Sequence, residues 1–88
     1  MKLIITIIKD SSQDVLTNEL TAGNFRVTHI ASTGGFFRKG YTTLLIGVEE
    51  ERVDAALDVI RKSCPPATEP GEKRATIFIL NVNQFYQI

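Results

Sequence analysis

Apolar residues fall along the chain in segments that alternate between strand-like and helix-like patterns. Residues 2–9, KLIITIIK, form a nearly unbroken apolar run, which predicts a strand buried on both faces or at the centre of a sheet. Three further runs rich in apolar and β-branched residues predict strands, and two segments with apolar residues at helical spacing predict helices. The predicted elements are a strand over 2–9, a helix over 11–22, strands over 25–31 and 41–48, a helix over 49–63 and a strand over 75–82.

The ends of the two predicted helices carry local signals. Ser11 and Asp14 fit the S-x-x-D capping pattern, and Gly23 can adopt a left-handed conformation that ends the first helix. Acidic residues 49–51 at the start of the second helix and basic residues 61–62 at its end match the helix dipole. The side chains expected to face the sheet are Val15, Leu16 and Leu20 in the first helix and Val53, Leu57, Ile60 and Cys64 in the second.

The order β-α-β-β-α-β predicts an α+β fold, the ferredoxin-like sandwich with four strands and two helices on one face. Eighty-eight residues suffice for one domain, which we expect to span residues 1–88. Alternation along the second strand places Phe25, Val27 and His29 on one face, and Arg26, Thr28 and Ile30 on the other.

Charge and composition exclude several classes of protein. Ten basic and ten acidic residues cancel, which argues against a binder of nucleic-acid polymers and favours self-association. One cysteine and one histidine make a disulfide or a metal site improbable, so a domain of this size is expected to pack very well or to oligomerise. The longest apolar run is too short to span a bilayer and no signal peptide is recognisable, so we expect a cytoplasmic protein without membrane insertion.

The glycine-rich stretch Thr33–Tyr41 is the most informative segment. Gly35 and Gly40 have the spacing of a phosphate-binding loop, but Tyr41 and Thr42 replace the required Lys and Ser/Thr, and the segment leads into a strand. A nucleotide triphosphatase is therefore rejected.

Residues 39–41, KGY, match the first positions of the RNP1 motif of RNA-recognition domains, which share the predicted topology. That motif needs aromatic residues where this chain has Thr43 and Ile46, so RNA binding is disfavoured.

Several residues remain as candidates for binding a ligand. Phe36 and Phe37 either fill the end of the sandwich or a subunit contact, or stack on a flat ring such as a purine. Arg26 either is a solvated strand residue or offers its planar fork to phosphate oxygens, with Thr28 as a second donor. We interpret His29 as a half-buried strand residue and Cys64 as a packed core thiol. No nucleophile and base occur in a recognisable arrangement, so an enzyme is not favoured.

These residues together resemble a known family. The chain is similar to the PII-like cyclic di-AMP receptor proteins of Gram-positive bacteria, over nearly its whole length. N-F-R-x-T followed by T-G-G-F is fairly specific in combination. The stretches that carry the resemblance are KLIITIIKD at 2–10, NFRVT at 24–28, STGGF at 32–36, TT at 42–43, GV at 47–48, ERVD at 51–54, ATIF at 75–78 and QFYQI at 84–88.

The resemblance implies a ferredoxin-like, PII-like subunit that assembles into homotrimers and binds cyclic di-AMP, a bacterial second messenger, in clefts between subunits. It implies a signalling protein rather than an enzyme, without a cofactor, whose loops rearrange on binding and alter contact with an unidentified partner protein. The implied ligand residues are Asn24, Arg26 and Thr28 for base and phosphate groups, Gly35, Phe36 and Phe37 around an adenine, Gly47 for close backbone approach, and Gln87 from the C-terminal end.

The chain departs from the family pattern at three places. The family usually has a long excursion between the second helix and the last strand, where this chain has only residues 65–74. It commonly has asparagine in place of Tyr41 and often leucine in place of Phe37. The alternative is therefore a PII-like protein-interaction module that binds another adenine nucleotide or none.

Overall fold

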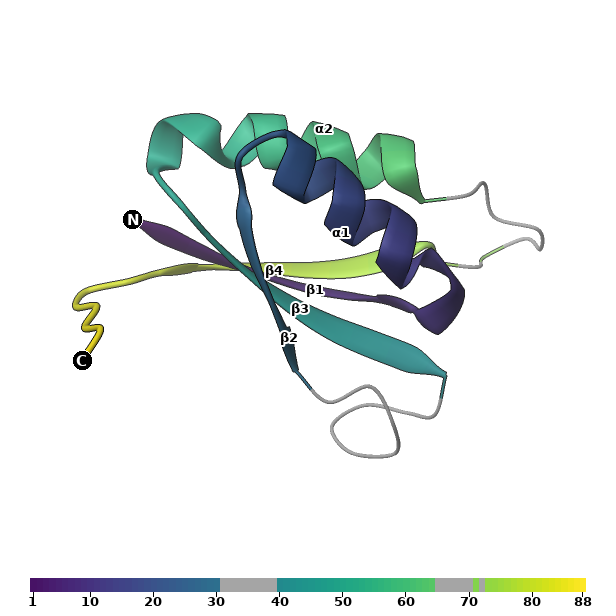
Figure 1. Cartoon of the computed structure of the whole chain (residues 1–88), viewed down its shortest axis with the longest axis horizontal. Helices are drawn as coiled ribbons and strands as arrows, with labels where there is room; N and C mark the ends of the chain where they lie inside the picture. Colours follow the sequence, from purple (N-terminus) through teal and green to yellow (C-terminus); the bar gives the residue numbers. More distant parts are fainter. Residues whose placement is uncertain (31–39, 65–70, 72) are drawn as a thin grey trace.

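The computed structural model of the chain describes residues 1–30, 40–64, 71 and 73–88, and Figure 1 shows their arrangement. All four predicted strands and both predicted helices are present to within a few residues, and the second strand begins at Arg26 instead of Phe25. The elements are β1 Lys2–Lys9, a 3₁₀ turn Asp10–Ser12, α1 Gln13–Ala22, β2 Arg26–Ile30, β3 Tyr41–Val48, a 3₁₀ turn Glu50–Arg52, α2 Val53–Ser63 and β4 Ala75–Asn81.

The four strands form one antiparallel sheet in the order β2-β3-β1-β4. Both α1 and α2 lie on the same face of this sheet, as Figure 1 shows. The prediction of an α+β, ferredoxin-like sandwich is therefore confirmed. The apolar run of β1 lies between β3 and β4, which explains why this strand needs few polar residues.

The strand register sorts the side chains onto two faces, because directly opposed residues in a sheet project to the same side. The face under the helices, called the helix face below, carries Val27 and His29 of β2 with Leu44 and Ile46 of β3 and Ile4 of β1. The opposite side is called the open face, and no helix of the described residues covers it. Its residues are Arg26, Thr28, Ile30, Tyr41, Thr43, Leu45, Gly47, Leu3, Ile5, Ile7, Lys9, Thr76, Phe78 and Leu80.

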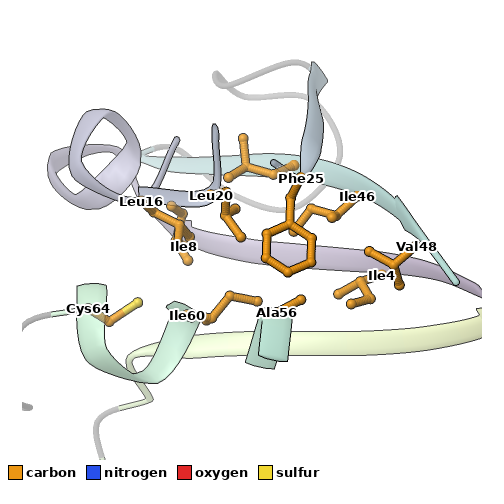
Figure 2. Packing of buried hydrophobic residues seen from close by; sticks show 11 residues of the cluster. Ile4, Ile8, Leu16, Leu20, Phe25, Ile46, Val48, Ala56, Ile60 and Cys64 are labelled. Carbon is orange, nitrogen blue, oxygen red and sulfur yellow. The ribbon is translucent and has the colours of Figure 1, made fainter. Parts of the chain in front are cut away.

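The hydrophobic core lies between the helix face and the two helices. Figure 2 shows the ring of Phe25 directed into the space between the sheet and α2, near Ala56 and Ile60. Val15 was predicted to join this core, but 52% of it is exposed. The reason is helical geometry: Leu16 and Leu20 lie one above the other at i and i+4, whereas Val15 is rotated about 100° away from Leu16.

The predicted helix starts are wrong in detail. Ser11 lies inside a 3₁₀ turn, and Ser12, the residue before α1, makes no side-chain capping bond. The second helix begins at Val53 instead of Glu49, because Glu50–Arg52 also forms a 3₁₀ turn. The acidic residues therefore lie ahead of the α-helix, where a negative charge still favours the positive end of its dipole.

Candidate functional site

The turn between α1 and β2 holds the first candidate residue, Asn24. The Phe25 amide donates to the Leu20 carbonyl at 2.9 Å, and the Asn24 amide donates to the Thr21 carbonyl at 3.0 Å. This pair of bonds is the Schellman motif, whose penultimate position requires a left-handed residue. Asn24 occupies that position with φ of 67°, and asparagine tolerates it better than most residues.

Gly23 therefore does not play the predicted role. Its φ is −85°, so the left-handed conformation belongs to Asn24 instead. A Cβ at Gly23 would lie 3.2 Å from two atoms of the Phe25 ring, so the glycine serves the close approach of that ring. The motif's expected apolar contact is present, since Leu20 and Phe25 both belong to the core.

Two more candidates project from β2 onto the open face. Arg26 and Thr28 are both exposed and lie about 7 Å apart along the strand. Because β2 is an edge strand, its outer side has no neighbour within the described sheet. Arg26, Thr28 and the turn residue Asn24 therefore line one edge of the subunit.

Gly47 lies directly opposite Arg26 in the register of β2 and β3. It is exposed, and a Cβ built there would meet only the Met1 methyl, at 3.7 Å. Contacts inside the described subunit thus leave room for a side chain at this position. Any need for glycine here must come from a group other than the described residues of this subunit.

Gln87 does not join this group. It follows β4, which forms the opposite edge of the sheet, and its side chain is exposed. In the register, Arg26 is separated from Leu80 by Gly47 and Leu3, which is three strand spacings or roughly 14 Å. The candidates Gly35, Phe36 and Phe37 lie outside the described residues.

Tyr41, the residue at which the chain departs from the family pattern, begins β3 on the open face. It shares that face with Gly47 but lies six residues away, roughly 20 Å along the strand. Tyr41 is half-buried and is the last residue of the glycine-rich stretch; it does not lie next to Arg26.

The start of β3 is fixed to the end of β1. The Asp10 amide donates to the Gly40 carbonyl at 2.8 Å, and the Thr42 hydroxyl donates to the Asp10 carboxylate, with Gln13 Oε1 3.2 Å from the same hydroxyl. Gly40 has φ of 88°, which a residue with a side chain adopts only with strain. Asp10 therefore has a structural role at the boundary of the glycine-rich stretch.

An RNA-recognition surface is not supported by the two central strands. In domains of that kind, aromatic residues on the open face stack on bases. The open face of β1 carries Leu3, Ile5 and Ile7, and that of β3 carries Thr43, Leu45 and Gly47 after Tyr41. These aliphatic and small side chains cannot stack on bases.

The remaining candidate for acid–base chemistry is His29. It is exposed, not half-buried as predicted, because β2 lies at the edge of the sheet. Its Nε2 lies 3.2 Å from the Thr17 hydroxyl on α1. Among the described residues, no group of three or more His, Cys, Asp and Glu side chains could hold a metal ion.

Cys64 is buried at the end of α2, as predicted for a core thiol. Burial raises the pKa of the Cys64 thiol above its ordinary value, and the positive charge of Arg74 opposes this in part. The thiol is therefore a weak nucleophile at neutral pH. No helix of the described part of the chain is long and apolar enough to cross a membrane.

The fold and the arrangement of the edge residues define a PII-like protein of the ferredoxin-like class, and comparison with known proteins identifies the family. The model of the family described as cyclic-di-AMP receptor matches residues 1–73. A crystal structure of a functionally unknown protein from Pediococcus pentosaceus ATCC 25745 is similar, with 35% identity and a TM-score of 0.78, over 99% of this chain and 96% of that one. The chain belongs to the cyclic-di-AMP receptor family.

Side-chain contacts identify one residue that the sequence alone did not single out. The Arg52 guanidinium donates through Nη2 to the Gly23 carbonyl at 2.8 Å and through Nη1 to the Asn24 carbonyl at 3.3 Å. It also lies 4.1 Å from the centroid of the Phe25 ring. Arg52 was part of the E-R-V-D stretch that contributed to the resemblance, but no sequence pattern indicated these contacts.

Proposed function

We propose that this protein is a cyclic di-AMP receptor that binds its ligand between the subunits of a homotrimer. The observation that carries the proposal is the edge formed by Arg26, Thr28 and Gly47 in a chain of the cyclic-di-AMP receptor family. Arg26 supplies a planar fork for a phosphate, Thr28 supplies a hydroxyl about 7 Å further along, and Gly47 leaves room for a close approach. Asn24 contributes an amide from the adjoining turn.

A chain with zero net charge is compatible with this ligand. A nucleic-acid polymer needs many positive charges along its backbone, whereas a cyclic dinucleotide carries only two phosphates. One arginine at the right place can bind one phosphate bidentately. A local donor is therefore sufficient where a basic surface is missing.

The position of Gln87 supports a site shared between subunits. Within one subunit, Gln87 follows the edge strand β4, and Arg26 lies on the other edge strand, β2. The two edges of one sheet lie roughly 14 Å apart, whereas two neighbouring subunits can bring opposite edges together at one ligand. Gln87 of one subunit and Arg26 of the next would then contact the same ligand.

The open face supports self-association for a separate reason. Phe78 and Leu80 are 49% and 47% exposed, and they extend an apolar row that contains Leu3 and Ile5. Exposed apolar patches of this kind commonly mark protein interfaces. A trimer packed through the open faces would cover them and would supply the buried area that a small domain lacks.

Signalling is proposed to follow from the glycine-rich stretch. Gly35, Phe36 and Phe37 would close around an adenine, and the resulting rearrangement would change the surface offered to a downstream protein partner. The ligand is an intracellular messenger, so we place the protein in the cytoplasm.

The alternative function is a PII-like interaction module that takes another adenine nucleotide or none. Tyr41 in place of asparagine and the short connection over residues 65–74 favour this alternative. The Pediococcus protein is comparable in length, since the match covers 99% of this chain and 96% of that one. In this alternative, a conformational change would reach a partner protein through the glycine-rich stretch and not through a long connection between α2 and β4.

Titration calorimetry with cyclic di-AMP, cyclic di-GMP, ATP and AMP tests the ligand. We expect heat with cyclic di-AMP, and we expect Arg26→Ala to weaken binding by about 1.5–3 kcal/mol, the scale of a hydrogen bond to a charged group. Arg61→Ala is the matched control, because Arg61 is an exposed α2 residue that pairs with the exposed Asp58 at 3.2 Å. It removes the same charge from a different surface.

Each outcome of the calorimetry has a definite meaning. Absence of heat with all four nucleotides would refute a nucleotide receptor, and heat with ATP or AMP alone would favour the alternative. Equal affinity of Arg26→Ala and wild type would identify Arg26 as a solvated strand residue. Asn24→Gly keeps a residue that accepts a positive φ, so a loss of affinity in this variant reports on the amide side chain and not on the turn.

A further inference from the structure

We propose that Arg52 is a positioning residue for ligand binding, acting through the turn that presents Asn24 and Arg26. This inference rests on the proposed function for its ligand and on the geometry of Arg52 for its mechanism. Arg52 reaches three consecutive residues of the turn: it donates to the carbonyls of Gly23 and Asn24 and its guanidinium lies over the Phe25 ring. The next residue is Arg26.

The turn needs an external partner for its carbonyl groups. Its amides are already satisfied, since those of Gly23, Asn24 and Phe25 all donate back to carbonyls of α1. The carbonyls of Gly23 and Asn24 accept hydrogen bonds from the two terminal nitrogens of Arg52. A guanidinium suits this task, because its fork can reach two neighbouring oxygens in a fixed geometry.

Charge favours the same arrangement. The C-terminal end of a helix carries a partial negative charge, which a nearby cation stabilises. The last turn of α1 contains no basic residue of its own. Arg52 supplies this cation from the turn before α2, and the Phe25 ring adds a cation–π contact.

One short segment, residues 47–52, supports Arg26 in two ways. Gly47 opposes Arg26 in the sheet, and Arg52, five residues further along the chain, holds the turn that leads into it. The segment is itself fixed, because the Arg52 amide donates to the Glu49 carbonyl at 2.9 Å. Asn24 in its left-handed conformation leaves little tolerance for a shift, so loosening Arg52 should misplace both Asn24 and Arg26.

The affinity of Arg52→Gln for cyclic di-AMP is the first measurement. We expect it to fall by roughly five- to twentyfold, on the scale of the net contribution of a single hydrogen bond. Arg52→Lys keeps the charge near Phe25 but loses the fixed fork, so its affinity should lie between those of wild type and Arg52→Gln. Arg61→Gln, an equal change on the exposed side of α2, should bind as wild type does.

A double variant separates positioning from general destabilisation. If Arg52 acts through Arg26, the loss caused by Arg52→Gln should be smaller in the Arg26→Ala background than in the wild-type background, and the remaining loss should come from Asn24. A purely structural effect would remain the same in both backgrounds. Equal affinities of Arg52→Gln and wild type, or an unchanged loss in the double variant, would overturn the proposal.

Amide hydrogen exchange tests the turn without ligand. Arg52→Gln should speed exchange of the Asn24 and Phe25 amides about tenfold or more, while β1 amides exchange as in wild type. Wild-type protein that binds no nucleotide would refute the proposed function, and exchange would still decide whether Arg52 holds the turn. Unchanged exchange at Asn24 and Phe25 would contradict the inference whatever the ligand.

Discussion

The two faces of the sheet are almost equally apolar, yet the described helices cover only one of them. On the helix face, Ile4, Leu44 and Ile46 are fully buried beneath α1 and α2. On the open face, Phe78 and Leu80 leave about half of their surface in contact with solvent. Figures 1 and 2 show this contrast: the two helices and the packed core lie on the same side of the strands.

The subunit therefore completes one core by itself, while the open face is buried at Ile7 and Thr43 and exposed at Phe78 and Leu80. In the proposed trimer, a neighbouring subunit would cover the exposed part. The proposed ligand residues Arg26, Thr28 and Gly47 lie on the open face, at its β2 edge. They are therefore placed where a neighbouring subunit would approach. Folding and ligand binding would thus depend on opposite faces of the same four strands, and substitutions on each face should have different consequences.

The largest expected effect is on the helix face. Leu16→Ala truncates a fully buried side chain of α1, so we expect a loss of about 2–5 kcal/mol in the free energy of unfolding. Denaturant unfolding at fixed protein concentration measures it. Val15→Ala is the control: this neighbour in α1 is 52% exposed, and its truncation should change stability by less than about 0.5 kcal/mol. Similar losses for both variants would mean that α1 does not pack as described.

The next effect should appear in the oligomeric state and not in the fold. Phe78→Asp places a charge on the open face, so we expect the proposed trimer to dissociate to monomers while the far-ultraviolet circular dichroism is retained. Native mass spectrometry measures the assembly. Ile79→Asp is the matched control, since Ile79 is the next residue of β4, is 42% exposed and projects to the helix face. Monomers in wild type, or trimers in Phe78→Asp, would contradict an interface on the open face.

The fold could be predicted from the sequence because its determinants are local and periodic. The apolar run of β1 indicated a central strand, and the alternation along β2 correctly separated Arg26 and Thr28 from Val27. The helix ends were harder. The left-handed residue lies at Asn24 instead of Gly23, since a shift of one residue in the end of α1 moves the whole motif, and sequence alone does not fix that end.

The site could be predicted only in part. Arg26 and Thr28 were named from their chemistry and from strand alternation, Gly47 was named from the resemblance, and the register brings the three together at one edge. The contacts of Arg52 could not be predicted, because they join residues 28 and 29 positions apart through the packing of α2 beside α1. The distance of Gln87 from Arg26 also required the strand order, which the linear sequence does not specify.

The smallest effect concerns Cys64, a buried core residue that directly follows α2. Burial raises the pKa of its thiol above the ordinary value of 9.0, so the folded state keeps the proton at a pH where the unfolded chain loses it. The stabilisation from this thiol is complete below about pH 9 and is lost as pH rises through the folded pKa. Unfolding of wild type and Cys64→Ala between pH 7.5 and about pH 10.5 measures the difference.

Cys64→Ala should be less stable than wild type at neutral pH, and the gap should narrow at high pH. Taking the difference between the two proteins removes the titration of lysines and tyrosines, which both share. A constant gap would mean that the thiol ionises equally in the folded and unfolded states. In that case water would reach Cys64 in the folded state, and the contrast between the two faces would be limited to the centre of the core.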